Sequence, residues 1–309
     1  MRKHISTIIA VLIFITGLSL LLYPTVSECW NSLYQSKVVA NYSDKMKKMT
    51  QKQKQVAIDA AVAYNKTLVL NDARFTPTEE QSATYNRLLD ADGLGMMGYI
   101  VIPKISCKLS IHHTVNESVL QVGVGHLEGS SLPVGGKSTH CVLSSHRGLP
   151  SAKLFTELDE LVKGDIFYLH VYDRVLTYKV DHIATIEPDD YSLFEIEEGK
   201  DLCTLFTCTP YGINTHRLVV RGHRISDALD GAKLNGDAIK INEYIVAICI
   251  AVIILCTGYT IRKAIKKIKR HLVQNTPSCK SQYKNVGLGQ YKNVGFPTFL
   301  YCLFSLHLL

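Results

Sequence analysis

A run of β-branched and apolar residues ends on a cysteine at residues 202–212, LCTLFTCTPYG. The run predicts a β-strand, and Thr209-Pro210 predicts its end because proline has no N–H for the hydrogen-bond ladder. The pattern therefore places the Cys208 thiol at the end of a strand. We expect it to face the opening of a barrel rather than the barrel's middle.

Two further residues are candidates to act with this thiol. A second strand-like run, residues 215–220, follows closely, so a hairpin would bring Arg217 beside Cys208. A guanidinium stays charged and offers several donors to a developing oxyanion. His146 lies where the strand-like residues 140–144 give way to a Gly/Pro loop. A nearby imidazole raises the thiolate fraction of a cysteine and can protonate an amine leaving group.

Short strand-like runs separated by Gly, Pro, Asp and Asn dominate residues 95–225. This spacing predicts a mainly-β domain with short helices, folded as a closed antiparallel β-barrel. Residues 28–94 have a helical pattern and form the expected helical region before the barrel. The strand-like runs are 97–103, 109–113, 140–144, 165–171, 175–180, 202–208 and 218–224.

Two uncharged apolar stretches, residues 5–23 and 244–261, are each long enough to cross a membrane of about 30 Å as a helix. We expect residues 1–27 to be an N-terminal anchor or signal-like segment. No small-x-small cleavage site follows it, which favours an uncleaved anchor. Residues 226–243 are then a linker, 244–261 a second transmembrane helix, and 262–309 a basic cytoplasmic tail.

The charge is distributed unevenly. The 34 basic and 27 acidic residues give a formal charge of +7, but residues 24–243 carry 23 basic and 27 acidic residues. The basic excess lies in the tails, which argues against nucleic acid as a partner. Cations at both tails predict cytoplasmic termini and an extracellular central domain, with membrane lipid as a partner.

The cysteines and histidines indicate a nucleophilic thiol and argue against a metal site. An odd number of cysteines falls in the central segment, so at least one thiol there is expected to be free and is a candidate nucleophile. Neighbouring residues of a strand point to opposite faces, which argues against metal binding by the pairs His112/His113 and His140/Cys141. We expect neither a metal nor a cofactor. The central cysteines are Cys29, Cys107, Cys141, Cys203 and Cys208.

The sequence TLFTC at residues 204–208 resembles the TLxTC signature of sortases, the cysteine transpeptidases of Gram-positive cell surfaces. Residues 123–133, 145–150 and 208–224 resemble class C, the pilin-polymerising sortases, in the same order along the chain. The resemblance covers residues 95–225. It implies a sortase β-barrel with Cys208 as nucleophile, His146 as general acid/base and Arg217 as stabiliser of the oxyanion or substrate.

Class C sortases usually carry a lid with an Asp-Pro-aromatic motif. Here the corresponding region is NDARFTP, residues 71–77, where the spacing differs and the proline of the motif is absent. Asp72 is a candidate partner of Arg217 and Phe75 a candidate cover of Cys208. Tyr211 is a further candidate for substrate or lid contact. We expect a degenerate or missing lid and a more open cleft.

The sequence thus predicts a membrane-anchored extracellular transpeptidase. It would cleave an LPxTG-like sorting signal through a thioester on Cys208 and transfer it to a lysine amine of a pilin subunit, in pilus assembly. Three alternatives stay open: a surface cysteine protease that uses water as acceptor, a sortase that anchors proteins to the cell wall, and an anchored scaffold without catalysis.

Overall fold

The computed structural model describes residues 2–91, 93–225, 257–259, 262–263 and 265–266. Residues 10–240 belong to one compact unit, whose described part holds the barrel and the helices packed on it. The predicted linker, most of the predicted second transmembrane helix and nearly all of the basic tail lie outside the described residues.

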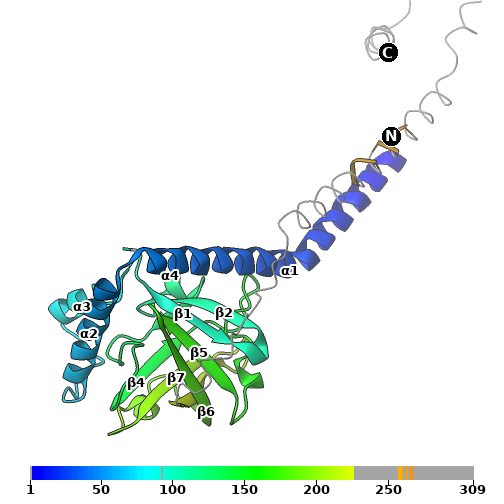
Figure 1. Cartoon of the computed structure of the whole chain (residues 1–309). Helices are drawn as coiled ribbons and strands as arrows, with labels where there is room; N and C mark the ends of the chain where they lie inside the picture. Colours follow the sequence, from blue (N-terminus) through cyan, green and yellow to red (C-terminus); the bar gives the residue numbers. More distant parts are fainter. Residues whose placement is uncertain (1, 92, 226–256, 260–261, 264, 267–309) are drawn as a thin grey trace, which may run out of the picture. The chain divides into compact units, whose positions relative to one another are not determined.

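In the part of the chain that the structure describes, three helices precede the barrel and are labelled in Figure 1. Helix α1 spans Arg2–Lys48 without a break, so it crosses the expected boundary at residue 27 and continues past Pro24. By length and composition, α1 is the one helix among the described residues that could cross a membrane, and its place near the N-terminus also fits a signal sequence. Helices α2 (Gln51–Leu68) and α3 (Glu79–Tyr85) each begin with a capping box, at Thr50 and Thr78.

The described residues form eight strands that close into a barrel in the order β1-β2-β3-β4-β7-β8-β6-β5. This confirms the mainly-β barrel. Four short helical turns, η1 (Pro103–Ile105), α4 (Glu117–Leu120), η2 (Leu158–Glu160) and η3 (Ser192–Phe194), lie between strands. The strands are β1 (Met96–Ile102), β2 (Cys107–His113), β3 (Val124–His126), β4 (Thr139–Ser144), β5 (Ile166–Val171), β6 (Arg174–Ile186), β7 (Asp201–Thr209) and β8 (His216–Arg224).

The barrel is not antiparallel throughout, which corrects the expectation from the sequence. β2 pairs with β3, and β4 with β7, in parallel. Parallel neighbours need a crossover connection instead of a tight hairpin. The segment that contains α4 makes this connection between β2 and β3, and the hairpin of β5 and β6 intervenes between β4 and β7. Local sequence patterns do not reveal pairings between strands so far apart in the chain.

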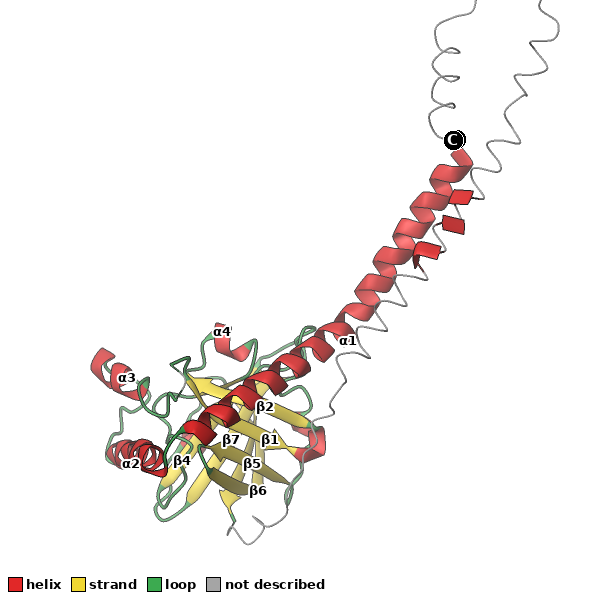
Figure 2. Ribbon diagram, turned by 45° about the horizontal axis from the view of Figure 1, so that its top comes forward, coloured by secondary structure: helices red, strands yellow, loops and turns green. Residues whose placement is uncertain are grey.

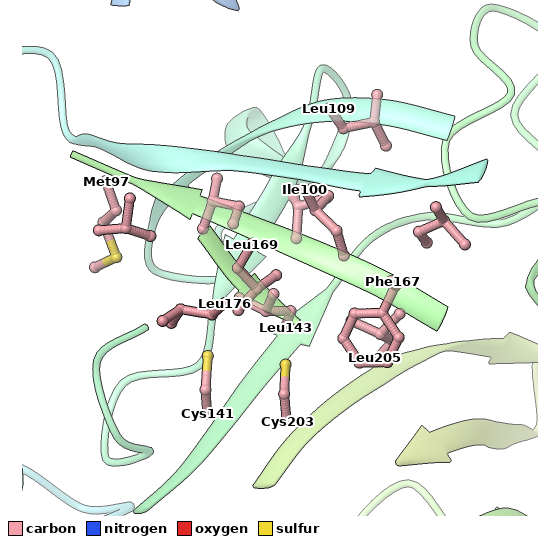
Figure 3. Packing of buried hydrophobic residues seen from close by; sticks show 14 of the residues in the cluster. Met97, Ile100, Leu109, Cys141, Leu143, Phe167, Leu169, Leu176, Cys203 and Leu205 are labelled. Carbon is pink, nitrogen blue, oxygen red and sulfur yellow. The ribbon is translucent and has the colours of Figure 1, made fainter. Parts of the chain in front are cut away.

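The strands bury side chains on both faces. On β7, Cys203 and Leu205 point into the barrel core, whereas Phe206 belongs to a second cluster on the opposite face. Figure 3 shows the core, with Cys141 of β4 beside Cys203. We call the second set the outer-face cluster. It comprises Val142, Phe194 and Val219 with Phe75, Leu127, Ile186, Leu193 and Phe206 packed against them.

The C-terminal half of α1 is fixed to the barrel across β1 and β2 (Figure 2). The Gln35 side chain accepts a hydrogen bond of 2.9 Å from the Ser110 backbone N–H. The buried Tyr42 hydroxyl donates to the Met97 carbonyl and accepts from the Tyr172 N–H, both at 2.9 Å. These bonds satisfy buried polar groups, and a further bond of 3.0 Å from the Ser27 hydroxyl to the Ser151 carbonyl joins α1 to the folded domain from about residue 27 onward.

Candidate active site

The ladder between β7 and β8 places Cys208 directly opposite Arg217. Paired residues of antiparallel strands have Cα atoms about 4.5–5.5 Å apart and project to the same face. The expected hairpin is therefore present, and Cys208 and Arg217 are paired across it. Cys208 is half-buried and its thiol is free, as are the thiols of the other central cysteines.

The parallel ladder between β4 and β7 brings His146 to the same place. Ser144 is paired with Phe206, the Ser145 N–H donates to the Phe206 carbonyl at 3.4 Å, and the Thr207 hydroxyl donates to the Ser145 carbonyl at 2.7 Å. His146 is the next residue along the chain, so it lies at the level of Cys208. All three candidate catalytic residues thus come from the ends of neighbouring strands.

The Cys208 side chain lies on a different face of the strand from the one expected from the sequence. Thr207 is fully buried, and Leu205 packs in the barrel core. Because side chains alternate along a strand, Cys208 shares the opposite face with Phe206. The thiol therefore faces outward beside the outer-face cluster and not into the opening of the barrel. The sequence pattern marks where the strand ends but not which of its faces is turned inward.

His146 has a partner that the sequence analysis did not identify. Its Nε2 atom lies 3.1 Å from both carboxylate oxygens of Glu117, which begins α4. Hydrogen bonds from Gln121, first, and from His146 lower the pKa of the Glu117 carboxyl. Glu117 is 29 residues from His146 in sequence. An isolated acidic residue gives no signal of such a contact.

The Arg217 guanidinium is held over the turn between β7 and β8. Its Nη1 donates to the carbonyl oxygens of Asn214 at 3.3 Å and His216 at 3.1 Å. Asn214 has a φ of 63°, in the left-handed region that asparagine tolerates well. No ion pair joins Arg217 to Asp72 in the part of the chain that the structure describes; Asp72 lies exposed.

The segment of residues 71–77 occupies the outer face of the barrel. Phe75 packs on the outer-face cluster, with its ring centroid 5.1 Å from that of Tyr191. The buried Arg74 side chain forms an ion pair of 2.8 Å with Glu195 and donates to the Phe194 carbonyl at 3.3 Å. The segment therefore lies against the outer face of the barrel, and the expectation of a degenerate or missing lid stays a prediction.

The backbone of Arg74 passes close to Gly129, which allows the segment of residues 71–77 to lie against the β3–β4 loop. A Cβ atom at Gly129 would lie 2.2 Å from the Arg74 carbonyl oxygen, and its φ of 90° also favours glycine. The β3–β4 loop thus supplies a surface without a side chain, on which the backbone of Arg74 rests.

Tyr211 borders the other side of the candidate site. The side chain is 60% exposed, and its ring lies against Gly148, where an added Cβ would be 2.9 Å from the ring. The Arg147 guanidinium lies 6.0 Å from the Tyr211 ring centroid and donates to the Thr209 hydroxyl at 3.2 Å. Tyr211 is therefore close in sequence and space to both strand ends that carry Cys208 and His146.

The histidine and cysteine pairs considered for metal binding project to opposite faces. His140 is bonded to the Glu195 carbonyl and the Thr204 hydroxyl, each at 2.7 Å, whereas Cys141 packs in the core. Among the residues whose placement is described, no group of three or more His, Cys, Asp or Glu is arranged to hold a metal ion.

Comparisons with known proteins agree on one family. The family model "Sortase domain" matches residues 100–225. The crystal structure of sortase C1 from Streptococcus agalactiae is 47% identical, with a TM-score of 0.60, covering 62% of this chain and 98% of that one. Sortase C from Streptococcus pneumoniae is 43% identical, with a TM-score of 0.53, covering 62% and 97%.

A curated relative, sortase A of Bacillus anthracis, is 31% identical over 127 residues, 41% of this chain and 59% of that protein. Sortase D of Bacillus subtilis is 30% identical over 132 residues, 42% of this chain and 64% of that protein. The chain thus spans about three-fifths of the length of these two curated relatives.

Proposed function

Since this chain belongs to the sortase family of cysteine transpeptidases, we propose that it cleaves an LPxTG-like sorting signal and transfers the new acyl group to an amine. The observation that carries the proposal is the convergence of Cys208, Arg217 and His146 at the ends of three adjacent strands. A nucleophile, a fixed cation and a proton carrier within reach of one peptide carbonyl are what acyl transfer needs.

In the proposed mechanism, the Cys208 thiolate attacks the carbonyl of the Thr–Gly bond. Arg217 donates hydrogen bonds to the tetrahedral oxyanion, and its contacts with two carbonyls of the turn already hold the guanidinium in place. His146 gives a proton to the departing glycine amine, leaving a thioester on Cys208. An incoming amine then loses a proton to His146 as it forms the new amide bond, and the Cys208 sulfur leaves as the thiolate with which the cycle began. No cofactor takes part.

We propose that the acceptor is a lysine amine on a pilin subunit, so that the product is an isopeptide bond. Support comes from the similarity to class C sortases, one of which is described in connection with pilin substrate specificity. The likeness covers 98% and 97% of the two chains compared above. Pilin subunits with LPxTG-like signals are accordingly the proposed partners.

We place the enzyme at the cell membrane with its catalytic domain outside. The apolar helix α1 has the length and composition of a membrane anchor, and its C-terminal half is bonded to the barrel. A membrane-bound α1 would therefore hold the catalytic domain close to the bilayer. Together with the second apolar stretch in the sequence, this gives two anchors and both termini in the cytoplasm.

The test uses the full chain in detergent micelles, mixed with a pilin subunit that carries a sorting signal and an acceptor lysine. We expect ladders of covalent products that survive boiling in detergent. Cys208→Ala is expected to abolish both the ladders and the thioester visible by mass spectrometry. Hydrolysed signal without ladders would indicate a protease that uses water, and transfer only to a cell-wall peptide would indicate an anchoring sortase. Ladders that persist with Cys208→Ala would refute the proposal.

A further inference from the structure

A cavity of about 1160 Å³ lies away from Cys208 and is not used by the proposed mechanism. It is formed by the C-terminal half of α2, the β3–β4 loop, the first residues of β6 and β7, and the end of β8. Its volume exceeds that of most small-molecule sites, and it is large enough for several residues of a peptide.

Three exposed cations surround the cavity: Lys66 of α2, Lys137 of the β3–β4 loop and Arg174 at the start of β6. Within the described residues, none of the three forms an ion pair or a hydrogen bond through its side chain. Their charges therefore act on the cavity without compensation from a neighbouring carboxylate.

The two carboxylates in the cavity wall are compensated by other groups. Asp173 forms an ion pair of 2.6 Å with Lys54. Asp201 accepts hydrogen bonds of 2.8 Å from the Gly136 N–H and the Tyr178 hydroxyl, and it lies in the field of the Arg224 guanidinium. The cavity thus has a nearly neutral floor and a positive rim, which suits an anionic ligand.

The remaining walls are apolar, so a simple anion would leave much of the cavity unused. Leu70, two residues beyond the end of α2, lines the cavity and is 91% exposed. A ligand that fits both the positively charged rim and the apolar walls carries carboxylates and aliphatic side chains, as an acidic peptide segment does. The apolar lining consists of Val62, Val69, Leu70, Val134, Val175 and Leu176.

The cavity is distant from the proposed nucleophile. Asp201 begins β7 and Cys208 lies seven residues further along the same strand, which corresponds to about 23 Å. A single extended chain that reached both places would therefore need at least about seven residues between its acidic segment and its scissile bond.

The cavity is also distant from the apolar part of α1. Ser27 donates to the Ser151 carbonyl, near His146, whereas Tyr42 is bonded to Tyr172, next to the cavity residue Asp173. The stretch of helix between these contacts spans about 22 Å. A membrane that holds the apolar part of α1 would lie on the side of the domain away from the cavity. Lipid headgroups would therefore not reach the cavity, whereas a protein could.

We propose that this cavity is a docking site for an acidic, aliphatic-rich segment of the protein substrate, held at the end of the barrel opposite to Cys208. The identity of the partner rests on the proposed function, because the substrate is taken to be a pilin. The site would retain the substrate while its sorting signal is exchanged at the thiol, and it would favour substrates with acidic segments.

The test measures binding by fluorescence anisotropy to the full chain in detergent micelles. The probe is a fluorescein-labelled peptide of about twelve residues with the repeat Glu-Glu-Leu, and the matched control peptide has the repeat Lys-Lys-Leu. The protein variants are Lys66→Glu/Lys137→Glu and, as a control of equal charge change, Lys52→Glu/Lys163→Glu, whose residues lie outside the cavity. A milder variant, Lys66→Gln/Lys137→Gln, serves if the first does not fold.

We expect the acidic peptide to bind with a Kd that rises at least tenfold in the cavity variants and less than twofold in the control variant. Binding should weaken as salt is raised, and the lysine peptide should not compete. Equal losses in the cavity and control variants, undiminished binding in the cavity variants, or equal binding of the lysine peptide would each overturn the docking site.

Cleavage of a short peptide that carries only an LPxTG-type signal separates this inference from the proposed function. We expect the cavity variants to cleave it at the rate of the unaltered chain. If the acidic peptide binds as expected while the signal peptide is not cleaved, the proposed function fails, and with it the identification of the partner as a substrate, whereas the cavity stands as a binding site for acidic segments. If the signal peptide is cleaved but no acidic peptide binds, only the docking site fails.

Discussion

His146 Nε2 lies 3.1 Å from both carboxylate oxygens of Glu117, although α4, which carries Glu117, is only four residues long. The Glu117 side chain is 67% exposed and also accepts a hydrogen bond of 3.1 Å from the Gln121 side chain. A carboxylate in this position fixes the orientation of the imidazole ring. Glu117 would then act through His146, without contact with the substrate.

We predict that Glu117→Gln lowers kcat about threefold to tenfold and leaves KM for the sorting signal nearly unchanged. The glutamine keeps a hydrogen-bond acceptor but loses the charge, so catalysis should weaken without being abolished. Steady-state kinetics with a signal peptide measures the effect. Glu160→Gln, at an exposed position of η2, is the matched control. A change confined to KM would show that Glu117 contacts the substrate instead.

Arg217→Lys tests whether the reaction needs the donors of the guanidinium or only its positive charge. A lysine keeps the positive charge but loses the planar fork of donors, and its ammonium cannot bond the turn carbonyls and the oxyanion in the same way. We expect kcat/KM to fall about 100-fold, as when an oxyanion donor is removed. Alkylation of Cys208 by iodoacetamide should continue at a similar rate. A variant with full activity would show that the charge alone is sufficient.

The sequence predicts those parts of the site that depend on local structure. Cys208 and Arg217 meet through a hairpin, and strand patterns with a turn between them are local signals. His146 meets Cys208 only because β4 and β7 pair in parallel, which no local pattern specifies. The family resemblance and the position of His146 at the end of a strand predict that it lies at the site. The pairing of β4 with β7 is known only from the structure.

Other features depend on contacts between distant segments. Glu117 reaches His146 through the α4 crossover, and Arg74 reaches Glu195 across 121 residues. Neither side chain stands out in the sequence, because an exposed acid and a lone arginine occur on most protein surfaces. The outward direction of Cys208 likewise depends on which strand face the barrel encloses, and that follows from the closure of the whole sheet.

The Arg74–Glu195 ion pair is expected to hold the segment of residues 71–77 in place. Arg74→Met keeps much of the side-chain bulk but loses the ion pair and the bond to the Phe194 carbonyl. We predict that chymotrypsin then cleaves after Phe75 at least fivefold faster, and that the thiol of Cys208 is alkylated faster. Asp72→Ala, at an exposed position of the same segment, is expected to change proteolysis, alkylation and activity by less than twofold. Equal effects of the two substitutions would contradict this role of Arg74.

His140 makes the stability of the barrel depend on pH. Burial, above all, lowers the pKa of this histidine to about 4, and the hydrogen bond to the Glu195 carbonyl, which raises the pKa, offsets only part of this effect. The ring also contacts the Thr204 hydroxyl through Nε2. The neutral ring satisfies both partners, with Nδ1–H as donor and Nε2 as acceptor. Nearby charges from Arg221, Glu197 and Arg74 modify the pKa less than burial does.

Protonation of His140 in the unfolded chain determines whether stability rises or falls with pH. An unfolded histidine has a pKa of about 6.5, so the unfolded chain binds the proton more readily, and stability rises with pH between about 4 and 6.5. We predict that lowering the pH from 7 to 5 reduces the free energy of unfolding by about 2 kcal/mol through His140. His170, whose pKa burial also lowers to about 4, adds to the loss, although it is only half-buried.

Urea unfolding at pH 7 and pH 5 measures this dependence, and His140→Asn isolates the part due to His140. The variant is expected to be less stable than the unaltered chain at pH 7, because it loses one of the two buried hydrogen bonds. Its loss of stability between pH 7 and 5 should nevertheless be smaller by about 2 kcal/mol. An equal loss in both proteins would show that the ring is already protonated in the folded state or that other groups govern this pH range.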